Sequence, residues 1–349
     1  MKKQLTLLLA LFLLFACSDN KRVSPLENIS TQETKSIKGE TLLYGKAEKE
    51  FYDIAVTSSY YAFLNRSGNT VLEVFSRQNL DSPILTESRD SVNRGLLNPK
   101  FTKYNYQIKA EDNRLSLWDN ERFLQFEYTI NKEGSDYSLL RESKQIPEYK
   151  SVKLKLSYDY SITKEEIFGV PMENSRHQLF YFFSPDSGFY WVVPNFPSLK
   201  LPKDYRYQIL NAAHLAVNEE KKTAVAALRY INCVQFYDFR GKLKNQTIFG
   251  EKYEYPLFMP GENPVADKLS KTFIDICGDK DFLYCLYDGS QEYDKLSKIV
   301  VFKWTGQHIA TLQTDRSIRK IVCDTKRKVL IALAANQEGG RDVVRYKIP

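Results

Sequence analysis

Five polar residues stand at corresponding points of short strand-like runs that recur along the chain: Asp53, Asn105, His214, Asp275 and Lys320. Successive residues of a strand point to opposite faces. Because these five residues stand at corresponding positions, their side chains are expected to share one face of their strands. Carboxylates and an imidazole that converge in this way can hold a divalent cation or orient a polar ligand. They also suit a water-filled channel lined by solvated polar groups, and the sequence leaves both interpretations open.

The chain lacks the common spacings of catalytic sites. Its three histidines, His177, His214 and His308, fall in no HxH or HExxH pattern, which disfavours a conventional zinc hydrolase. GxSxG, Walker A and GxGxxG motifs are missing from the sequence as well. We therefore predict no catalytic residue, no metal and no cofactor. One catalytic alternative stays open, in which Asp53 and Asp275 act as paired carboxylates on glycosidic bonds.

The runs that must position these residues recur in a fixed order of strand, tight turn, strand, longer turn and strand. Four copies are clear, at 52–75, 213–239, 274–304 and 320–348. Two weaker copies, at 104–128 and 152–197, fill the gap between the first and second of these. A meandering antiparallel sheet cannot bury both faces alone, and stacking copies around an axis solves this problem. We predict an all-β, six-bladed β-propeller over residues 41–349. Seven blades are the main competitor, because 120–160 is hard to divide, and a tandem β-sandwich is the alternative fold.

The run Thr41-Leu42-Leu43-Tyr44 precedes the first copy. It is expected to complete the last blade, so that segments from the two ends of the chain pair and close the ring. A further segment, Ser184-Pro185-Asp186-Ser187-Gly188, resembles the Asp box of sialidases. Proline, aspartate, serine and glycine are residues that a turn requires, so we predict a hairpin turn there.

The N-terminus has the layout of an export signal. Lys2 and Lys3 precede an apolar run over 5–16 that is too short to span a bilayer. Ala16-Cys17 at the end of that run resembles the bacterial lipobox, which implies cleavage before Cys17 and a diacylglyceryl thioether on its sulfur. We predict a signal peptide over 1–16 and a lipidated cysteine with a flexible tether over 17–40. An ordinary signal peptide with an incidental cysteine is the alternative.

Four further cysteines lie inside apolar runs: Cys233, Cys277, Cys285 and Cys323. Buried small side chains are the default interpretation, and a Cys277–Cys285 bridge across one hairpin is conceivable. The chain carries a net charge of +7, with basic residues interspersed among acidic ones and no basic stripe. We therefore expect no nucleic acid as a partner.

The opening Asp53-Ile54-Ala55-Val56 and the closings over 236–242 and 301–306 resemble NHL and TolB-like propeller repeats. With the lipobox, the chain is similar to the TolB-like six-bladed propeller lipoproteins of Gram-negative envelopes. This resemblance implies a lipid-anchored outer-membrane protein and brings no catalytic residue, since the family has no generally assigned activity. We expect a binding or scaffold protein that presents its propeller to a protein or glycan partner. The alternative is a polysaccharide-acting enzyme.

Overall fold

The computed structural model describes most of the chain from residue 27 onward. The described ranges are 27–30, 34–47, 49–66, 69–88, 106–111, 114–119, 124–133, 136–145, 157–163, 166–171, 179–184, 188–192, 212–254 and 268–348. The predicted signal segment, Cys17 and Asn105 lie outside them. Within these ranges the chain forms strands and no α-helix. Accordingly, none of the described residues belongs to a helix that could cross a membrane.

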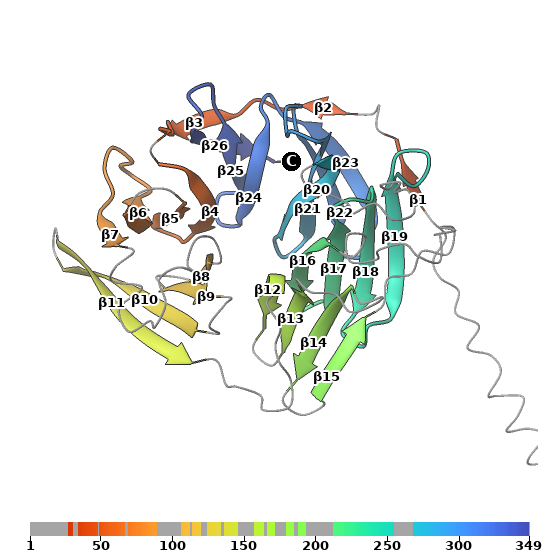
Figure 1. The fold of residues 1–349 in the computed structure, drawn as a ribbon, viewed down its shortest axis with the longest axis horizontal. Coiled ribbons are helices and arrows are strands. Elements are labelled where there is room, and N and C mark those ends of the chain that lie inside the picture. The colour runs from red at the N-terminus through yellow and green to blue at the C-terminus, as the bar shows by residue number, and fades with distance from the viewer. Residues whose placement is uncertain are drawn as a thin grey trace, which may run out of the picture.

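The first three sheets follow one another along the chain, and each is a four-stranded antiparallel meander (Figure 1). Sheet 1 holds β4 (Phe51–Val56), β5 (Tyr60–Asn65), β6 (Thr70–Ser76) and β7 (Leu85–Ser88). Sheet 2 holds β8 (Tyr106–Glu111), β9 (Arg114–Asp119), β10 (Leu124–Glu133) and β11 (Asp136–Gln145). Sheet 3 holds β12 (Ser157–Ile162), β13 (Ile167–Pro171), β14 (Phe180–Ser184) and β15 (Gly188–Val192). The stretch that was hard to divide therefore contributes the long β10–β11 hairpin.

The last three sheets repeat the meander and add a strand from the N-terminal segment at the outer edge. Sheet 4 holds β16 (Ala213–Asn218), β17 (Thr223–Leu228), β18 (Cys233–Asp238) and β19 (Leu243–Phe249), with β1 (Glu27–Ile29) outside β19. Sheet 5 holds β20 (Lys271–Gly278), β21 (Phe282–Ser290), β22 (Lys298–Lys303) and β23 (His308–Gln313), with β2 (Lys35–Ser36) outside β23. Sheet 6 holds β24 (Ile318–Asp324), β25 (Val329–Ala335) and β26 (Arg341–Lys347), with β3 (Glu40–Leu43) outside β26.

The first strand of each sheet faces one central region (Figure 1). These inner strands contact each other in the pairs β4–β8, β12–β16, β16–β20, β20–β24 and β24–β4. Among the described residues, five apolar clusters lie between consecutive sheets, and one of them packs Ile331 and Leu333 of sheet 6 against Phe63 of sheet 1. Every residue of β5 is buried, because sheet 1 packs against sheet 2 on one face and against sheet 6 on the other. This packing around a centre is propeller-like, and it differs from the paired sheets of a β-sandwich.

The N-terminal segment supplies the outer edge strands of sheets 4, 5 and 6. β3 pairs antiparallel with β26, with Thr41 opposite Val344, and this confirms the predicted pairing of the two ends of the chain. β1 and β2 pair parallel with β19 and β23. Residues 27–29 and 35–36, which the sequence assigned to a flexible tether, are therefore strands. Ile29 packs in the cluster between sheets 4 and 5, but the other residues of β1 and β2 are polar and conceal the strands.

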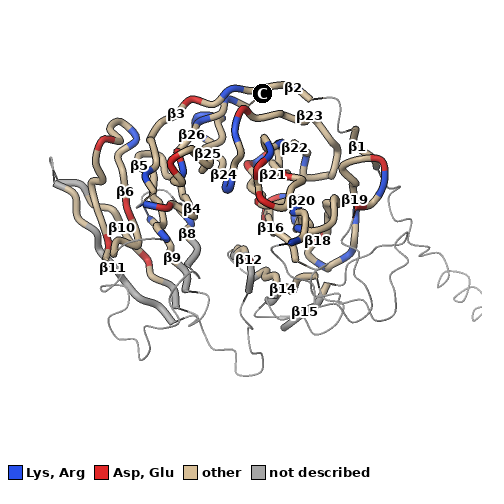
Figure 2. Tube along the Cα trace, turned by 45° about the horizontal axis from the view of Figure 1, so that its top comes forward, with Lys and Arg blue, Asp and Glu red and all other residues tan. Residues whose placement is uncertain are grey.

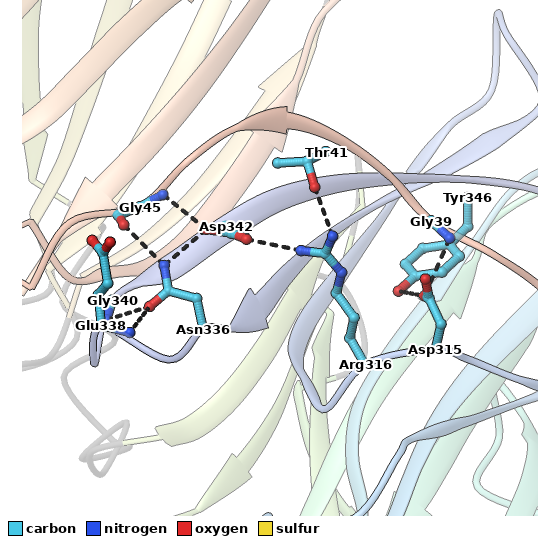
Figure 3. A network of polar contacts seen from close by, with 10 residues as sticks. All are labelled: Gly39, Thr41, Gly45, Asp315, Arg316, Asn336, Glu338, Gly340, Asp342 and Tyr346. Carbon is cyan, nitrogen blue, oxygen red and sulfur yellow. Dashed lines mark hydrogen bonds and ion pairs between the residues drawn. The ribbon is translucent and has the colours of Figure 1, made fainter.

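A polar network holds this segment on sheet 6 (Figure 3). Asp342 is buried and accepts hydrogen bonds from Gly45 N at 3.0 Å, Asn336 Nδ2 at 2.8 Å and Arg316 Nη1 at 2.8 Å. Arg316 Nη2 in turn donates to Thr41 Oγ1 at 2.8 Å. The contacts of Gly45 and Thr41 join residues 297 and 275 positions apart, so they stabilise the junction between the two ends of the chain.

Candidate functional site

Three aspartates connect the inner strands of neighbouring sheets. Asp53, Asp159 and Asp275 lie on β4, β12 and β20, the first strands of sheets 1, 3 and 5. Each carboxylate accepts a backbone N–H from the first strand of the next sheet: Ile108 N to Asp53 at 3.0 Å, Leu215 N to Asp159 at 2.9 Å and Ile321 N to Asp275 at 2.7 Å. Each aspartate side chain thus links two neighbouring sheets whose backbones form no hydrogen-bonded ladder with each other.

Lys320 on β24 neutralises two of these aspartates. Its Nζ lies 3.0 Å from Asp275 Oδ1 and 3.5 Å from Asp53 Oδ1. Burial raises the pKa values of Asp53 and Asp275, and Lys320 opposes the shift in both. Burial works in the opposite direction on Lys320, but Asp275, Asp53 and Asp159 outweigh it and leave the pKa of Lys320 raised. The ammonium group therefore stays charged and occupies the place that a cation between the two carboxylates would take.

His214 on β16 faces the third aspartate. Its Nδ1 lies 3.8 Å from Asp159 Oδ2. Burial lowers the pKa of His214 to about 4, against the attraction of Asp159, so the imidazole is neutral at pH 7. Lys109 on β8 interacts with Asp159, Lys320 and Asp53, and burial lowers its pKa. We refer to Asp53, Lys109, Asp159, His214, Asp275 and Lys320 as the axial cluster.

The axial cluster contains four of the five residues that the sequence singled out. Lys320 contacts both Asp53 and Asp275 directly, whereas His214 approaches Asp159, and Asn105 lies outside the described residues. Sequence reasoning missed Asp159, because the third copy was recognised by its aromatic runs. Its signal was available in Tyr158-Asp159-Tyr160, the same strand position as Asp53. No group of three or more metal-ligating side chains occurs in the part of the chain that the structure describes.

A basic pocket of about 420 Å³ opens directly beside the axial cluster. Five of its lining side chains are cationic and one is acidic: Arg66, Arg229, Arg319, Lys320 and Arg341, with Asp275. Tyr52, His214, Ile274 and Tyr293 complete the lining. In Figure 2 basic and acidic positions are interspersed along the described strands, so this concentration of arginines is local.

Chain topology explains why these arginines meet. In an antiparallel meander, the start of the first strand and the turn between the second and third strands lie at the same end of the sheet. Arg66 and Arg229 directly follow the second strands β5 and β17, and Arg341 begins the third strand β26. Arg319 lies near the start of β24, and Tyr293 lies between β21 and β22. These residues, from four sheets, therefore lie at one end of the central region that the first strands face.

Neighbouring groups hold the guanidinium groups in place. Arg341 donates to Glu50 Oε1 at 2.6 Å and to Phe51 O at 2.8 Å, and Arg229 donates to Tyr293 OH at 3.0 Å. The guanidinium of Arg319 lies 4.2 Å from the centre of the Tyr293 ring, a cation–π contact.

Arg319 retains binding capacity in this arrangement. Its Nη1 is shielded from solvent and has no hydrogen-bond partner among the described residues. Burial lowers the pKa of Arg319, and Asp288 opposes the shift. Burial likewise lowers the pKa of Arg341 to about 10, so both side chains are cationic at neutral pH. A buried donor without an acceptor is costly, and an anion in the pocket would relieve that cost.

The fold is all-β and propeller-like, and one similar solved structure agrees with this class. A member of the DUF4221 family from Bacteroides vulgatus superposes with a TM-score of 0.57 at 12% identity, covering 91% of this chain and 99% of that chain. A luciferin-regenerating enzyme gives a TM-score of 0.45 at 11% identity, over 89% of this chain and 95% of that chain. At 12% identity, the likeness to the DUF4221 protein shows the fold alone. No family model matches the chain, and no curated protein sequence does so either.

Proposed function

We propose that the protein is a six-bladed β-propeller, anchored at the cell envelope by a lipid on Cys17, that binds an anionic partner in its basic pocket. Each described sheet is one blade in this proposal. Among the described residues, apolar clusters join five of the six neighbouring pairs of sheets. These clusters and the β3–β26 pair, which is typical of propeller closure, support a count of six. The lipobox resemblance supports the anchor, and the strand motifs near Asp53 support a TolB-like relationship.

The observation that carries the binding proposal is the excess of five cationic side chains over one acidic side chain in a single pocket. Arginine forks match the geometry of carboxylate and phosphate oxygens. His214 lies on the axial side of the same pocket, where a neutral imidazole can exchange hydrogen bonds with hydroxyl groups. A volume of about 420 Å³ suits one acidic sugar or the terminal residues of an acidic peptide, which a larger partner would present.

The geometry of the carboxylates favours binding over glycoside hydrolysis. Asp275 uses Oδ1 for Lys320 and Oδ2 for the Ile321 amide. Asp53 accepts the Ile54 amide and Lys320 on Oδ1, and the Ile108 amide on Oδ2. Each oxygen of the two carboxylates is therefore engaged within the fold. A general acid or nucleophile needs an oxygen that is directed at the substrate.

Titration calorimetry with small anions tests this proposal. We suggest pyrophosphate and galacturonate as probes, with galactose as the neutral control, at low and high salt. The unsubstituted chain is expected to bind at least one anion more weakly as salt increases, and not to bind galactose. Arg319→Gln removes the guanidinium and is expected to weaken binding about tenfold or more. Arg240→Gln is the matched control, since Arg240 is exposed on the β18–β19 turn.

Two results would contradict the proposal. One is equal affinity of the unsubstituted chain and Arg319→Gln for an anion that both bind. The other is the failure of both anions to bind a chain whose thermal unfolding shows that it is folded. A circular dichroism spectrum of each variant separates loss of binding from loss of structure.

A further inference from the structure

Two cysteines from neighbouring inner strands meet beside the axial cluster. Cys277 lies near the end of β20 and Cys323 near the end of β24, and their sulfur atoms are 3.0 Å apart. Both side chains are half-buried, and both pack against the apolar cluster between sheets 5 and 6. β20 and β24 contact each other along the inner side of these sheets. The sulfurs are therefore about 1 Å from the covalent separation of roughly 2.05 Å.

The register of sheet 5 excludes the pair that the sequence suggested. Cys277 pairs with Tyr284, and Cys285 pairs with Ile276. Cys277 and Cys285 thus occupy successive pairs of the ladder, whose side chains point to opposite faces. Cys285 packs in the cluster between sheets 4 and 5, and Cys277 packs between sheets 5 and 6. A hairpin bridge between them would have to pass through the sheet.

We propose that Cys277 and Cys323 form a disulfide that cross-links the inner strands of sheets 5 and 6. The oxidant is the disulfide of a second protein, as a thiol oxidase supplies in an oxidising compartment. One cysteine thiolate attacks that disulfide and forms a mixed disulfide. The other cysteine thiolate then attacks the sulfur of the first cysteine in this mixed disulfide, which forms the bridge and releases the oxidant as a dithiol. The two thiols of this chain lose two electrons and two protons, and the oxidant gains both.

The position of this bridge gives it a role in organising the pocket. Asp275 lies two residues before Cys277, and Lys320 lies three residues before Cys323. The bridge would hold together the two strands whose side chains form the closest ion pair of the axial cluster, at 3.0 Å. Burial raises the pKa of the Cys277 thiol well above its usual value, which slows exchange once the sheets are packed.

Cysteine mapping on the unsubstituted chain tests the bridge directly. The full chain, isolated after export to an oxidising compartment, is denatured and alkylated before and after reduction, then digested for mass spectrometry. The expected result is a cross-linked peptide pair containing Cys277 and Cys323, lighter than the two separate peptides by two hydrogen atoms. Cys233 and Cys285 are expected to be alkylated without reduction. Full alkylation of Cys277 and Cys323 without reduction would overturn the proposal, as would a Cys277–Cys285 peptide.

Thermal unfolding supplies a second measurement. Reduction of the unsubstituted chain is expected to lower its Tm by roughly 5 °C or more, because the bridge closes a long loop in the unfolded chain. Cys323→Ser is expected to show no shift on reduction, and the matched variant Cys285→Ser is expected to keep it. If Cys323→Ser does not fold, the mapping experiment still decides. The outcome is independent of the anion proposal, since neither measurement uses a ligand.

Discussion

Lys320 offers the sharpest test of how the axial cluster is stabilised. Its ammonium lies 3.0 Å from Asp275 and 3.5 Å from Asp53, two buried carboxylates. At an effective dielectric constant of about 20, each contact contributes roughly 5 kcal/mol before desolvation is subtracted. Removing one partner of a buried ion pair typically costs about 3–5 kcal/mol. Lys320 is itself 32% exposed, so we expect Lys320→Met to destabilise the chain by about 3 kcal/mol at pH 7.5.

The pH dependence of that loss has a definite sign. Burial already raises the pKa values of Asp53 and Asp275, and loss of Lys320 removes the charge that opposes this shift. A carboxyl whose pKa is higher in the folded than in the unfolded state binds its proton preferentially when folded. Stability from that proton is present below the unfolded pKa of about 4 and is lost as pH rises through the folded pKa. The difference between Lys320→Met and the unsubstituted chain should therefore shrink as pH falls from 7.5 to 5.

Urea unfolding followed by circular dichroism measures this difference at each pH. Lys303→Met is the matched control, since Lys303 is exposed at the end of β22 and the substitution is the same. Adding Asp53→Asn to Lys320→Met should restore part of the loss, because one of the two uncompensated charges disappears. A loss equal to that of Lys303→Met, or one that does not change with pH, would refute the ion-pair reasoning.

Two further predictions concern His214 and the N-terminal strands. His214 has a folded-state pKa of about 4, below the unfolded value of about 6.5. Between these pH values His214 is protonated in the unfolded chain and neutral in the folded chain, so the free energy of unfolding should fall by up to about 3 kcal/mol as pH drops through this window. Urea midpoints at pH 7 and 4.5 should show this loss in His308→Gln and not in His214→Gln, and an equal pH response in both variants would contradict it. A chain that starts at residue 38 lacks β1 and β2 and should keep its Tm but self-associate in size-exclusion chromatography. A chain that starts at residue 48 also lacks β3 and Gly45, which donates to Asp342, and should lose several degrees of Tm. Equal Tm values for the two truncations would show that β3 is dispensable.

Local periodicity explains which features the sequence predicted correctly. Strands alternate their side chains with a period of two, so Asp53, Asp275 and Lys320 could be assigned to one face from their neighbours alone. Turn-forming residue types predicted the hairpin at 184–188, and β14 and β15 pair there with Ser184 opposite Gly188. The sequence also indicated the run at 41–44, since an apolar strand without a copy of its own needs a sheet to complete.

Features that depend on contacts between sheets escaped prediction. Arg66 and Arg229 follow second strands in copies more than 160 residues apart, and turn positions carry no periodic signal. The two copies share one feature in the sequence: an arginine directly follows the second strand in each. Asp159 was missed for a different reason, because its copy was recognised by the aromatic runs of its later strands, although Asp159 stands at the same strand position as Asp53.

The sequence by itself determined the strands, their repeated order and the face on which the polar residues stand, because these depend on neighbours within a few positions. Tertiary structure decided which charges meet: Lys320 with Asp53 and Asp275, His214 with Asp159, and four arginines at one end of the axis. It also decided that Cys277 faces Cys323 and not Cys285. These partners come from different sheets, and the angle at which one sheet packs on the next sets their distances. That angle is the result of all the apolar contacts between the sheets, and no short stretch of sequence encodes it.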